Sequence, residues 1–481
     1  MDTKKLRQKI LDLAIRGKLV PQDPNDEPAS VLLERIRAEK ERLIKEGKIK
    51  RSKKTTSDTP HYENRQVGEA NETPFEVPEG WEWTTINDIC SKIGSGSTPR
   101  GSNYAKEGIP FFRSQNVYND GLVYDDIKYI SEEVHENMIG TEVRAKDLLL
   151  NITGGSLGRC AIVPDEFQKG NVSQHVCILR TIIVLPAYLH LFIISDYFAA
   201  TMILSGSGRE GLPKYSLETM QFPLPPHEEQ FRIVTTVDKW FTLIDTLESA
   251  KEDLQMSIAQ AKSKILDLAI HGKLLPQDPN DEPAIELLKR INPKFTPCDN
   301  AHDTNQLPNS WCWTTLGDVC ELVTGSTPSK LHPEYYGGDF PFYKPTDLDA
   351  GRHVNIPSEF LTDEGKNVSR IIPVGSTAIC CIGSIGKCGY IEKEGTTNQQ
   401  INTAVPSKSL SPLYLYYFCN SSYFIDELSA DSSAITISIV NKSKLSKMLI
   451  SLPPYNEQLR IVAKIEELFA VLDEMQKSIE A

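Results

Sequence analysis

Several short segments contain residues that often take part in catalysis, and each lacks a part that the chemistry requires. Leu452-Pro-Pro-Tyr and Leu224-Pro-Pro-His have leucine where an amino-methyltransferase needs Asp or Asn to accept a hydrogen bond from the target amine. Gly94-Ser-Gly96 has no third glycine in the position that a dinucleotide-binding loop uses. Pro164-Asp165-Glu166 lacks the lysine and the spacing that hold magnesium in a nuclease. We therefore predict helix starts and turns at these segments, and no catalytic residue in the chain.

Three cysteines, Cys380, Cys381 and Cys388, lie close together in the sequence. Tetrahedral zinc is usually held by paired Cys-x-x-Cys sets, and none accompanies them. We interpret them as small buried thiols and predict no metal site. His175 and its neighbour Gln174 could contact a nucleobase, although a lone histidine is also typical of a satisfied structural residue. Both interpretations of His175 stay open.

An internal repeat defines the elements that must position these residues. The segment Lys9–Ile36 recurs nearly unchanged at Lys264–Ile291, 255 positions later. A second pair of nearly identical segments is Leu224–Val234 and Leu452–Val462. Between them lie two diverged domains, which share Trp-x-Trp-Thr-Thr, Gly-Ser-Thr-Pro and Gly-Ser-x-Gly-Arg/Lys-Cys blocks. We call these two pairs of nearly identical segments the joints. Because the joints are alike while the domains between them differ, the sequence suggests two similar domains that recognise two different targets.

The repeat predicts seven consecutive segments. They are a conserved N-terminal helix and segment at 1–36, a basic helix and linker at 37–76, a first variable domain at 77–222, a central helical spacer at 223–291, a linker at 292–307, a second variable domain at 308–450 and a conserved C-terminal helix at 451–481. The basic run at 37–54 is interpreted as a solvated helix and tail, with a contact to DNA or a partner as the alternative.

The sequence of the joints predicts long helices. His227–His271 carries a sustained heptad pattern, and a helix of this length is a rod of about 67 Å. Because the C-terminal copy stops where the N-terminal copy begins, the repeat is circular. We expect α/β (α+β) domains joined by long antiparallel helices with pseudo-twofold organisation and adjacent termini. The residues predicted to pack along the spacer are Val237, Trp240, Ile244, Leu247, Leu254, Ile258, Ile265, Leu268, Ile465, Leu468, Leu472 and Met475.

Composition sets outer limits on the function. The chain has 481 residues, of which 40% are hydrophobic, enough for two or more domains with buried cores. No apolar stretch is long enough to span a membrane, and the ten cysteines lack the spacing of a disulfide framework, so we expect a cytoplasmic protein. The formal net charge of -13 argues against indiscriminate binding of nucleic acid.

Several features of the sequence point to one known family: the two-copy layout, the Leu-Pro-Pro-x-x-Glu-Gln-x-Arg-Ile-Val joints, the Gly-Lys-Leu-Val-Pro-Gln-Asp-Pro-Asn-Asp-Glu-Pro-Ala segment and the domain openings. In these features the chain resembles the DNA-specificity (S) subunit of a type I restriction-modification system. The resemblance covers essentially the whole chain. It implies that each variable domain is a target-recognition domain for one half of a bipartite double-stranded DNA sequence, with the helices as spacer. It also implies two adenine-methyltransferase (modification) subunits and motor/nuclease (restriction) subunits as partners. S-adenosylmethionine, ATP and magnesium would then belong to those partners, with no cofactor in this chain.

The resemblance also indicates where to look for DNA contacts, since base edges are read by side-chain donors and acceptors on loops. Two other functions stay open, a DNA-independent coiled-coil scaffold and an independent DNA-modifying enzyme, although the missing motifs disfavour the enzyme. We call a residue that is a candidate to contact a base a reader. For each candidate reader, the alternative is that it is a solvated residue in a turn. The candidates are Ser97, Thr98, Arg100, Arg113, Gln115, Asn116, Arg159, Gln174 and His175 in the first domain, and Ser326, Thr327, Lys330, Lys344, Lys387, Asn398, Gln399 and Gln400 in the second.

Overall fold

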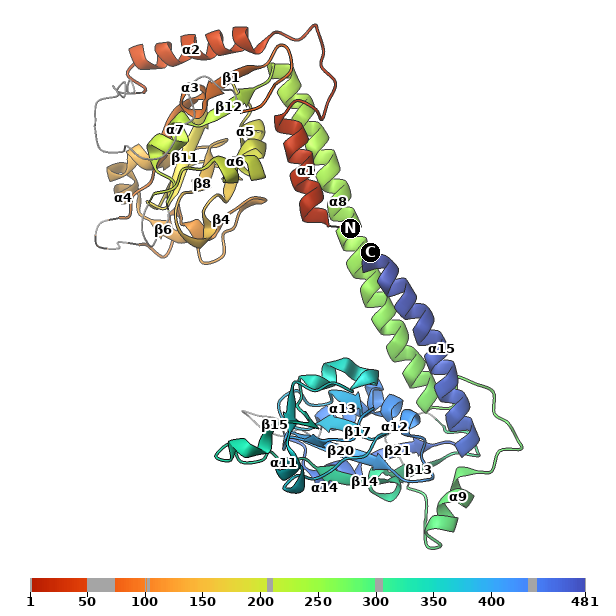
Figure 1. The fold of residues 1–481 in the computed structure, drawn as a ribbon. Coiled ribbons are helices and arrows are strands. Elements are labelled where there is room, and N and C mark those ends of the chain that lie inside the picture. Colours follow the sequence, from red (N-terminus) through yellow and green to blue (C-terminus); the bar gives the residue numbers. More distant parts are fainter. Residues whose placement is uncertain are drawn as a thin grey trace. The chain divides into compact units, whose positions relative to one another are not determined.

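The computed structural model describes residues 2–49, 74–99, 101, 104–205, 211–298, 306–430 and 439–480. Contacts within the chain divide it into two compact units, Met1–Ser249 and Ala250–Ala481, called unit 1 and unit 2 below. The boundary falls inside helix α8 (His227–Ile270), so each unit contains part of this helix (Figure 1). Within the described ranges, no helix is both long enough and apolar enough to cross a membrane.

Unit 1 mixes short strands with helices. Its elements before α8 are α1 (Thr3–Ile15), α2 (Ala29–Lys45), β1 (Glu82–Thr85), α3 (Ile86–Ile89), β2 (Cys90–Ser95), β3 (Ile109–Phe112), η2 (Ser114–Asn116), β4 (Val117–Tyr118), β5 (Gly121–Leu122), β6 (Lys128–Ile130), α4 (Glu132–Asn137), η3 (Ile139–Thr141), β7 (Glu142–Val143), β8 (Leu148–Asn151), η4 (Gly154–Ser156), β9 (Cys160–Ile162), β10 (Gly170–Val172), β11 (Val176–Thr181), α5 (Pro186–Ile193), α6 (Asp196–Thr201), α7 (Lys214–Thr219) and β12 (Gln221–Leu224).

Unit 2 follows a similar order. Its elements after α8 are α9 (Ala284–Ile291), β13 (Cys312–Thr315), α10 (Leu316–Val319), β14 (Cys320–Thr324), η5 (Pro333–Tyr335), β15 (Tyr336–Tyr343), η6 (Asp347–His353), β16 (Glu359–Leu361), α11 (Asp363–Asn367), β17 (Thr377–Cys380), β18 (Cys388–Tyr390), β19 (Thr396–Thr397), β20 (Ile401–Pro406), α12 (Pro412–Cys419), α13 (Ser422–Ala430), α14 (Lys442–Lys447), β21 (Leu449–Leu452) and α15 (Tyr455–Glu480).

The sheets of the two units correspond. Unit 1 has a ribbon β1-β12, a four-stranded sheet β2-β11-β8-β9 and a second sheet β6-β3-β10-β7, together with the hairpin β4-β5. Unit 2 has the ribbon β13-β21, the sheet β14-β20-β17-β18 and the sheet β16-β15-β19. In the ribbons, Glu82 lies opposite Leu224 and Cys312 lies opposite Leu452. The prediction of two similar α/β domains is confirmed, and each ribbon pairs the strand that opens a domain with the strand that leads into the following joint.

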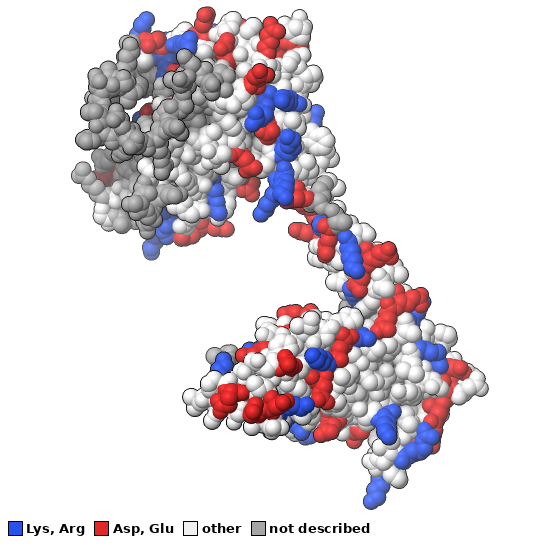
Figure 2. Space-filling model, in the orientation of Figure 1, with Lys and Arg blue, Asp and Glu red and all other residues white. Residues whose placement is uncertain are grey.

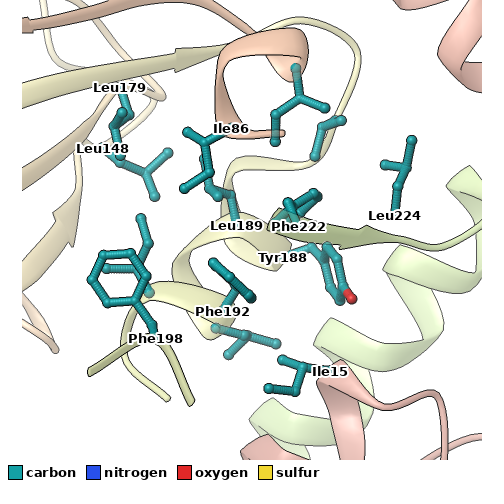
Figure 3. Close-up of a cluster of buried hydrophobic side chains, with 14 of the residues drawn as sticks. Ile15, Ile86, Leu148, Leu179, Tyr188, Leu189, Phe192, Phe198, Phe222 and Leu224 are labelled. Carbon is teal, nitrogen blue, oxygen red and sulfur yellow. The ribbon is translucent and has the colours of Figure 1, made fainter. Parts of the chain in front are cut away.

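An aromatic helix fills the core of each unit. Figure 3 shows Tyr188 and Phe192 of α5 meeting Phe222 of β12, with the rings of Phe192 and Phe222 at 5.1 Å and edge to face. The buried hydroxyl of Tyr188 donates to the carbonyl of Pro223 (3.2 Å), so its polar end is satisfied. Tyr414 of α12 makes the same kind of bond in unit 2. The core therefore ties the aromatic helix to the strand that leads into α8 or α15.

Long helices pack in pairs in each unit. In Figure 1, α1 lies beside the first part of α8 and α15 beside the second part, and each runs antiparallel to α8. Arg7 of α1 pairs with Asp245 of α8 (2.6 Å), and Lys262 of α8 pairs with Asp473 of α15. The predicted antiparallel helices are therefore present in both units.

The buried seam of these helices is narrower than the heptad pattern predicts. Val237, Ile244, Ile258 and Ile465 are buried, and Ile265, Leu268, Leu468 and Leu472 are half-buried. Trp240, Leu247, Leu254 and Met475 are between 46% and 54% exposed, so their predicted packing within the chain is wrong. Among the described residues, each part of α8 packs against one other long helix. Trp240 and Leu247 each lie three positions after a buried seam residue, Val237 or Ile244, and therefore about 60° around the helix from it. The second row of the seam is therefore left uncovered.

A buried hydrogen-bond network anchors each domain to its helix. In unit 1, Glu229 of α8 is 1% exposed and accepts from the Trp81 indole (2.9 Å) and from the Gln22 amide (2.8 Å). Burial raises the pKa of Glu229, while these two hydrogen bonds oppose the rise. Beside it, Arg232 forms two hydrogen bonds to Asp26. Three segments that are distant in the sequence meet here: the Pro-Gln-Asp-Pro loop, the residue directly before β1, and α8.

The same anchor recurs in unit 2. Glu457 of α15 accepts from the Trp311 indole (2.9 Å), and Arg460 forms two hydrogen bonds to Asp281. Burial raises the pKa of Glu457 as well. The near-identity of the joints therefore reflects one shared set of contacts rather than helix propensity alone.

Candidate nucleic-acid interface

The ends of several strands of unit 1 meet at one edge. In the sheet β2-β11-β8-β9 every neighbouring pair is antiparallel, so the end of β2, the start of β11, the end of β8 and the start of β9 lie together. The connected segments 96–99, 152–159 and 173–175 form what we call the loop edge of unit 1. Most predicted readers of the first domain lie on these segments, although they are scattered in the sequence.

The Gly-Ser-Thr-Pro turn is fastened to this edge by backbone contacts. Gly96 donates to Val176 (3.0 Å) and Ser97 donates to Val172 (3.1 Å). A Cβ atom at Gly96 would lie 1.8 Å from the carbonyl oxygen of Val172, so only glycine fits. The side chains of Ser97 and Thr98 are exposed. The turn is therefore a built part of the edge that leaves two hydroxyl side chains at the surface.

A chain of side-chain hydrogen bonds crosses the loop edge of unit 1. Thr98 donates to the Gln174 side-chain oxygen, and the Gln174 amide contacts Nε2 of His175 at 3.2 Å. Because an amide nitrogen only donates, Nε2 accepts, and Nδ1 of His175 donates to the Thr153 hydroxyl (2.7 Å). Gln174 is exposed and His175 half-exposed. The structure thus brings Thr98, Gln174 and His175 together, and adds Thr153, which sequence reasoning missed.

Unit 2 has an equivalent loop edge, formed by the segments 325–328, 381–387 and 398–400. Gly325 donates to Ile401 (3.0 Å) and Ser326 donates to Thr397 (2.8 Å), as in the first turn. Thr327 donates to the side-chain oxygen of Gln399, the same pairing as that of Thr98 with Gln174. The hydroxyl of Ser326 is buried and lacks a hydrogen bond within the described part of the chain, so it is a poor candidate for base contact.

The Asn-Gln-Gln segment replaces Ser-Gln-His at the second edge. The amide of Asn398 donates to the side chain of Gln400 (3.0 Å), and the backbone of Gln400 donates to Asn398 (3.1 Å). The carbonyl of Gln400 accepts from Cys381 (2.8 Å), as the carbonyl of His175 accepts from Ile152 (3.0 Å). Gln400 therefore occupies the place of His175, and the two edges present different groups there.

Three of the predicted readers, Arg113, Gln115 and Asn116, lie together after β3. They take no part in the side-chain hydrogen bonds that cross the loop edge of unit 1. Arg113 and Gln115 both contact the carboxylate of Asp126, at 3.1 and 3.0 Å. Hydrogen bonds from Lys128, Arg113 and Gln115 lower the pKa of Asp126 to about 2. Asn116 is fully buried and donates to the carbonyl of Val123 (3.0 Å). The prediction of Asn116 as a reader is wrong, because its amide holds the local loop together instead.

The remaining candidates are cations. Arg159 and Lys387 directly precede β9 and β18, at the two loop edges. Lys330 is exposed, and Lys344 follows β15 and pairs with Glu359 (2.7 Å). Arg100 lies outside the described residues. The partner of Lys344 could not be predicted from local sequence, because Glu359 lies 15 positions further along the chain.

The cysteines of unit 2 are buried, as predicted. Cys380, Cys381 and Cys388 are at most 4% exposed. Burial raises the pKa of Cys381 to about 11, so the thiol is uncharged at neutral pH. In the part of the chain that is described, no cluster of three or more His, Cys, Asp and Glu side chains is arranged to hold a metal ion.

Charge on the visible surface is mixed. Figure 2 shows Lys and Arg interspersed with Asp and Glu on both units, with acidic side chains gathered near α11 and β15. Among the described residues of the face in view, basic and acidic side chains are mixed. We therefore expect neutralisation of DNA phosphates to be local or to come from partners.

A duplicated α/β domain with a polar loop edge in each copy and a helical joint defines a recognition protein with two reading modules. The family of the type I restriction modification DNA specificity domain matches residues 78–256 and 308–481. The chain belongs to this family of DNA specificity subunits.

Similar proteins extend over the whole chain. The type I restriction enzyme EcoEI specificity subunit of Escherichia coli is 28% identical, with 99% of this chain and 91% of the relative covered. The EcoAI specificity subunit of Escherichia coli is 26% identical, with 98% and 90% covered. Among solved structures, a chain of a type I R-M system matches with a TM-score of 0.58 at 19% identity, covering 85% of this chain and 94% of that chain. The HsdS subunit from Thermoanaerobacter tengcongensis matches with a TM-score of 0.52 at 19% identity, covering 85% and 93%. At this identity the structural matches support the fold.

Proposed function

We propose that each unit reads one half of a bipartite double-stranded DNA sequence through its loop edge, and that α1, α8 and α15 set the spacing between the halves. The observation that carries the proposal is the pair of equivalent loop edges with different side chains, His175 in one and Gln400 in the other. Side-chain amides and imidazoles can bond base edges in the major groove, where each base pair offers a different pattern. Two such edges in one chain suit an asymmetric target of two parts.

The chain then acts without catalysis of its own. Two adenine-methyltransferase subunits and motor/nuclease subunits would supply the chemistry, with S-adenosylmethionine, ATP and magnesium bound to them, and the complex would work in the cytoplasm. The exposed apolar side chains Trp240, Leu247, Leu254 and Met475 support docking of partner helices on α8 and α15. Large apolar side chains that are exposed together on a surface often mark interaction sites.

Mapping methylated adenines tests the proposal. DNA is sequenced from cells that carry this chain with a modification subunit of the same system, and from cells that carry the modification subunit alone. We expect methylation in one bipartite sequence, and only when this chain is present. Methylation without sequence preference, or equal methylation in its absence, would favour the scaffold alternative.

The spacer role has a separate test. A seven-residue insertion near Lys251 keeps the heptad phase of α8 and lengthens the helix by about 10 Å. Both half-sites should stay the same while the gap between them grows by about three base pairs. A four-residue insertion turns the downstream seam out of register and should reduce activity more. Unchanged spacing with full activity after the longer insertion would show that the helices do not set the distance.

A further inference from the structure

One feature is kept at both loop edges although the readers around it differ. Each edge has a turn that ends in a cation, Arg159 in unit 1 and Lys387 in unit 2. Two glycines with positive φ shape each turn: Gly154 (+77°) and Gly158 (+87°) in unit 1, and Gly383 (+83°) and Gly386 (+83°) in unit 2. Glycine adopts this backbone conformation without the strain that a Cβ atom brings.

The two turns close with the same hydrogen bonds. Asn151 donates to the carbonyl of Arg159 (2.8 Å), and Cys380 donates to the carbonyl of Lys387 (2.8 Å). In return, the second glycine of each turn donates to Asn151 (2.9 Å) or Cys380 (3.1 Å). The turn of unit 1 is one residue longer, yet both turns place a cation at the same position, directly before the last strand of the sheet. The position of the cation is therefore a property of the shared backbone.

The neighbours of the two cations differ. The guanidinium of Arg159 lies over the ring of Tyr118, 4.7 Å from its centroid. The hairpin that carries Tyr118 is held by Asn119, whose side chain accepts from the backbone of Cys160 (3.0 Å). Within the described ranges, no carboxylate lies within ion-pair distance of Arg159. Stacking on the ring holds the guanidinium in place and leaves its charge uncompensated.

In unit 2, the cation pairs with an acidic side chain instead of stacking on an aromatic ring. The amine of Lys387 pairs with Asp349 of η6 at 2.5 Å. Asp349 is well exposed, whereas the Lys387 side chain is 28% exposed. The charge of Lys387 is thus compensated within the domain before any ligand arrives.

We propose that the Arg159 turn and the Lys387 turn contact DNA phosphates, and that Asp349 weakens the contact in unit 2. This inference rests on the proposed function and assigns roles within it. Two domains that read different bases still share one ligand feature, the sugar-phosphate backbone, and phosphate contacts position a protein without specifying sequence. A cation that is present in both domains is expected to contact the phosphates, which both half-sites share. Side chains that differ between the domains, such as His175 and Gln400, are expected to contact the bases.

The experiment uses the full chain assembled with its modification subunits. Affinity is measured for DNA of the methylated sequence and for DNA with both half-sites scrambled, over a range of salt concentrations. For Arg159→Ala we expect affinity to fall by the same factor on both DNAs, and the slope of log affinity against log salt to fall by about one. The methylated sequence should stay the same.

Two further variants keep the test independent of folding. Arg159→Lys retains the charge and should keep the salt slope, whereas a bidentate contact to guanine would be lost with it. Arg144→Ala is the matched control, because Arg144 is an exposed arginine that follows β7, at the other end of the strands, and pairs with Glu142 (2.6 Å). It should leave the salt slope unchanged.

Asp349→Asn tests the second half of the inference. Removing the acid should raise affinity for both DNAs and steepen the salt slope by up to about one, and adding Lys387→Ala should cancel the gain. A changed base preference in Arg159→Ala, an unchanged salt slope in that variant, or an Asp349→Asn complex that binds as before would overturn the inference. A wild-type complex without preference for the methylated sequence would instead refute the proposed function.

Discussion

The joints of the two units share their main side-chain contacts, whereas the loop edges share their backbone hydrogen bonds and one Thr–Gln pairing but differ in other side chains. Trp81 bonds Glu229 as Trp311 bonds Glu457, both at 2.9 Å. At the edges, the turns close with the same backbone hydrogen bonds, while the position of His175 in unit 1 is occupied by Gln400 in unit 2. Under the proposed function, the joints do the same work in both halves and carry the same side chains, whereas the loop edges meet different bases and differ at positions such as His175 and Gln400. The difference separates the part of the chain that holds each domain to its helix from the part that we propose reads DNA.

Exchange of a whole variable domain should have the largest effect on recognition. Replacing residues 77–222 with the corresponding domain of another family member should change one half-site of the methylated sequence completely and leave the other half intact. The near-identical joints accept the new domain because their contacts lie at the ribbon and at α8. The sequence of methylated sites gives the result, and altered bases in both halves would contradict the modular division.

Truncation of the anchoring tryptophans should destabilise both units similarly. Trp81→Ala removes a buried ring and leaves Glu229 without its indole donor, which should cost about 3 to 5 kcal/mol in the free energy of unfolding. Trp311→Ala should cost about the same, since its contacts match. Urea unfolding of each variant measures the cost. Costs that differ by several kcal/mol would show that the two anchors are not equivalent, and an exposed control such as Trp240→Ala should cost far less.

Single substitutions at the loop edges should act on one half-site each. His175→Gln gives the first edge the group of the second, and should change preference at one base pair of one half-site by roughly tenfold. Gln400→His should do the reverse in the other half-site. Binding to a library of sites with single base changes measures both. If His175→Gln weakened binding to every site alike, His175 would be a structural residue of the Thr98, Gln174 and Thr153 chain.

The architecture could be predicted from sequence because repetition is visible without any knowledge of side-chain contacts. The Lys9–Ile36 repeat and the Leu-Pro-Pro joints located both domains and the antiparallel helices. The edge was harder to predict. Thr153 and Tyr118 reach it only because strands distant in the sequence end side by side, and Asp126 and Asp349 compensate cations through tertiary contacts. A heptad pattern likewise shows which residues are apolar, while the number of partner helices decides that Trp240 stays exposed.

The smallest expected effect is a pH dependence that distinguishes the two anchors. Burial raises the pKa of Glu229 and of Glu457, so the folded chain keeps each proton at a higher pH than the unfolded chain. Their contribution to stability is greatest below the ordinary glutamate pKa and falls as pH rises through the folded value. Glu229 accepts hydrogen bonds at both oxygens, whereas Oε1 of Glu457 is buried without one in the described part of the chain.

Neutralising the two carboxylates should therefore have unequal results. At pH 7, Glu457→Gln should lower the free energy of unfolding by about 1 kcal/mol less than Glu229→Gln does. The reason is that the carboxylate of Glu457 has fewer hydrogen bonds than the carboxylate of Glu229. Each variant should also flatten the decline in unfolding free energy between pH 5 and pH 7. Urea unfolding at both pH values measures this, with Glu228→Gln as the control, since Glu228 is exposed beside Glu229 on α8. Equal losses at pH 7 would show that the unpaired oxygen of Glu457 carries no cost, and the two anchors would then be alike in energy as well as in geometry.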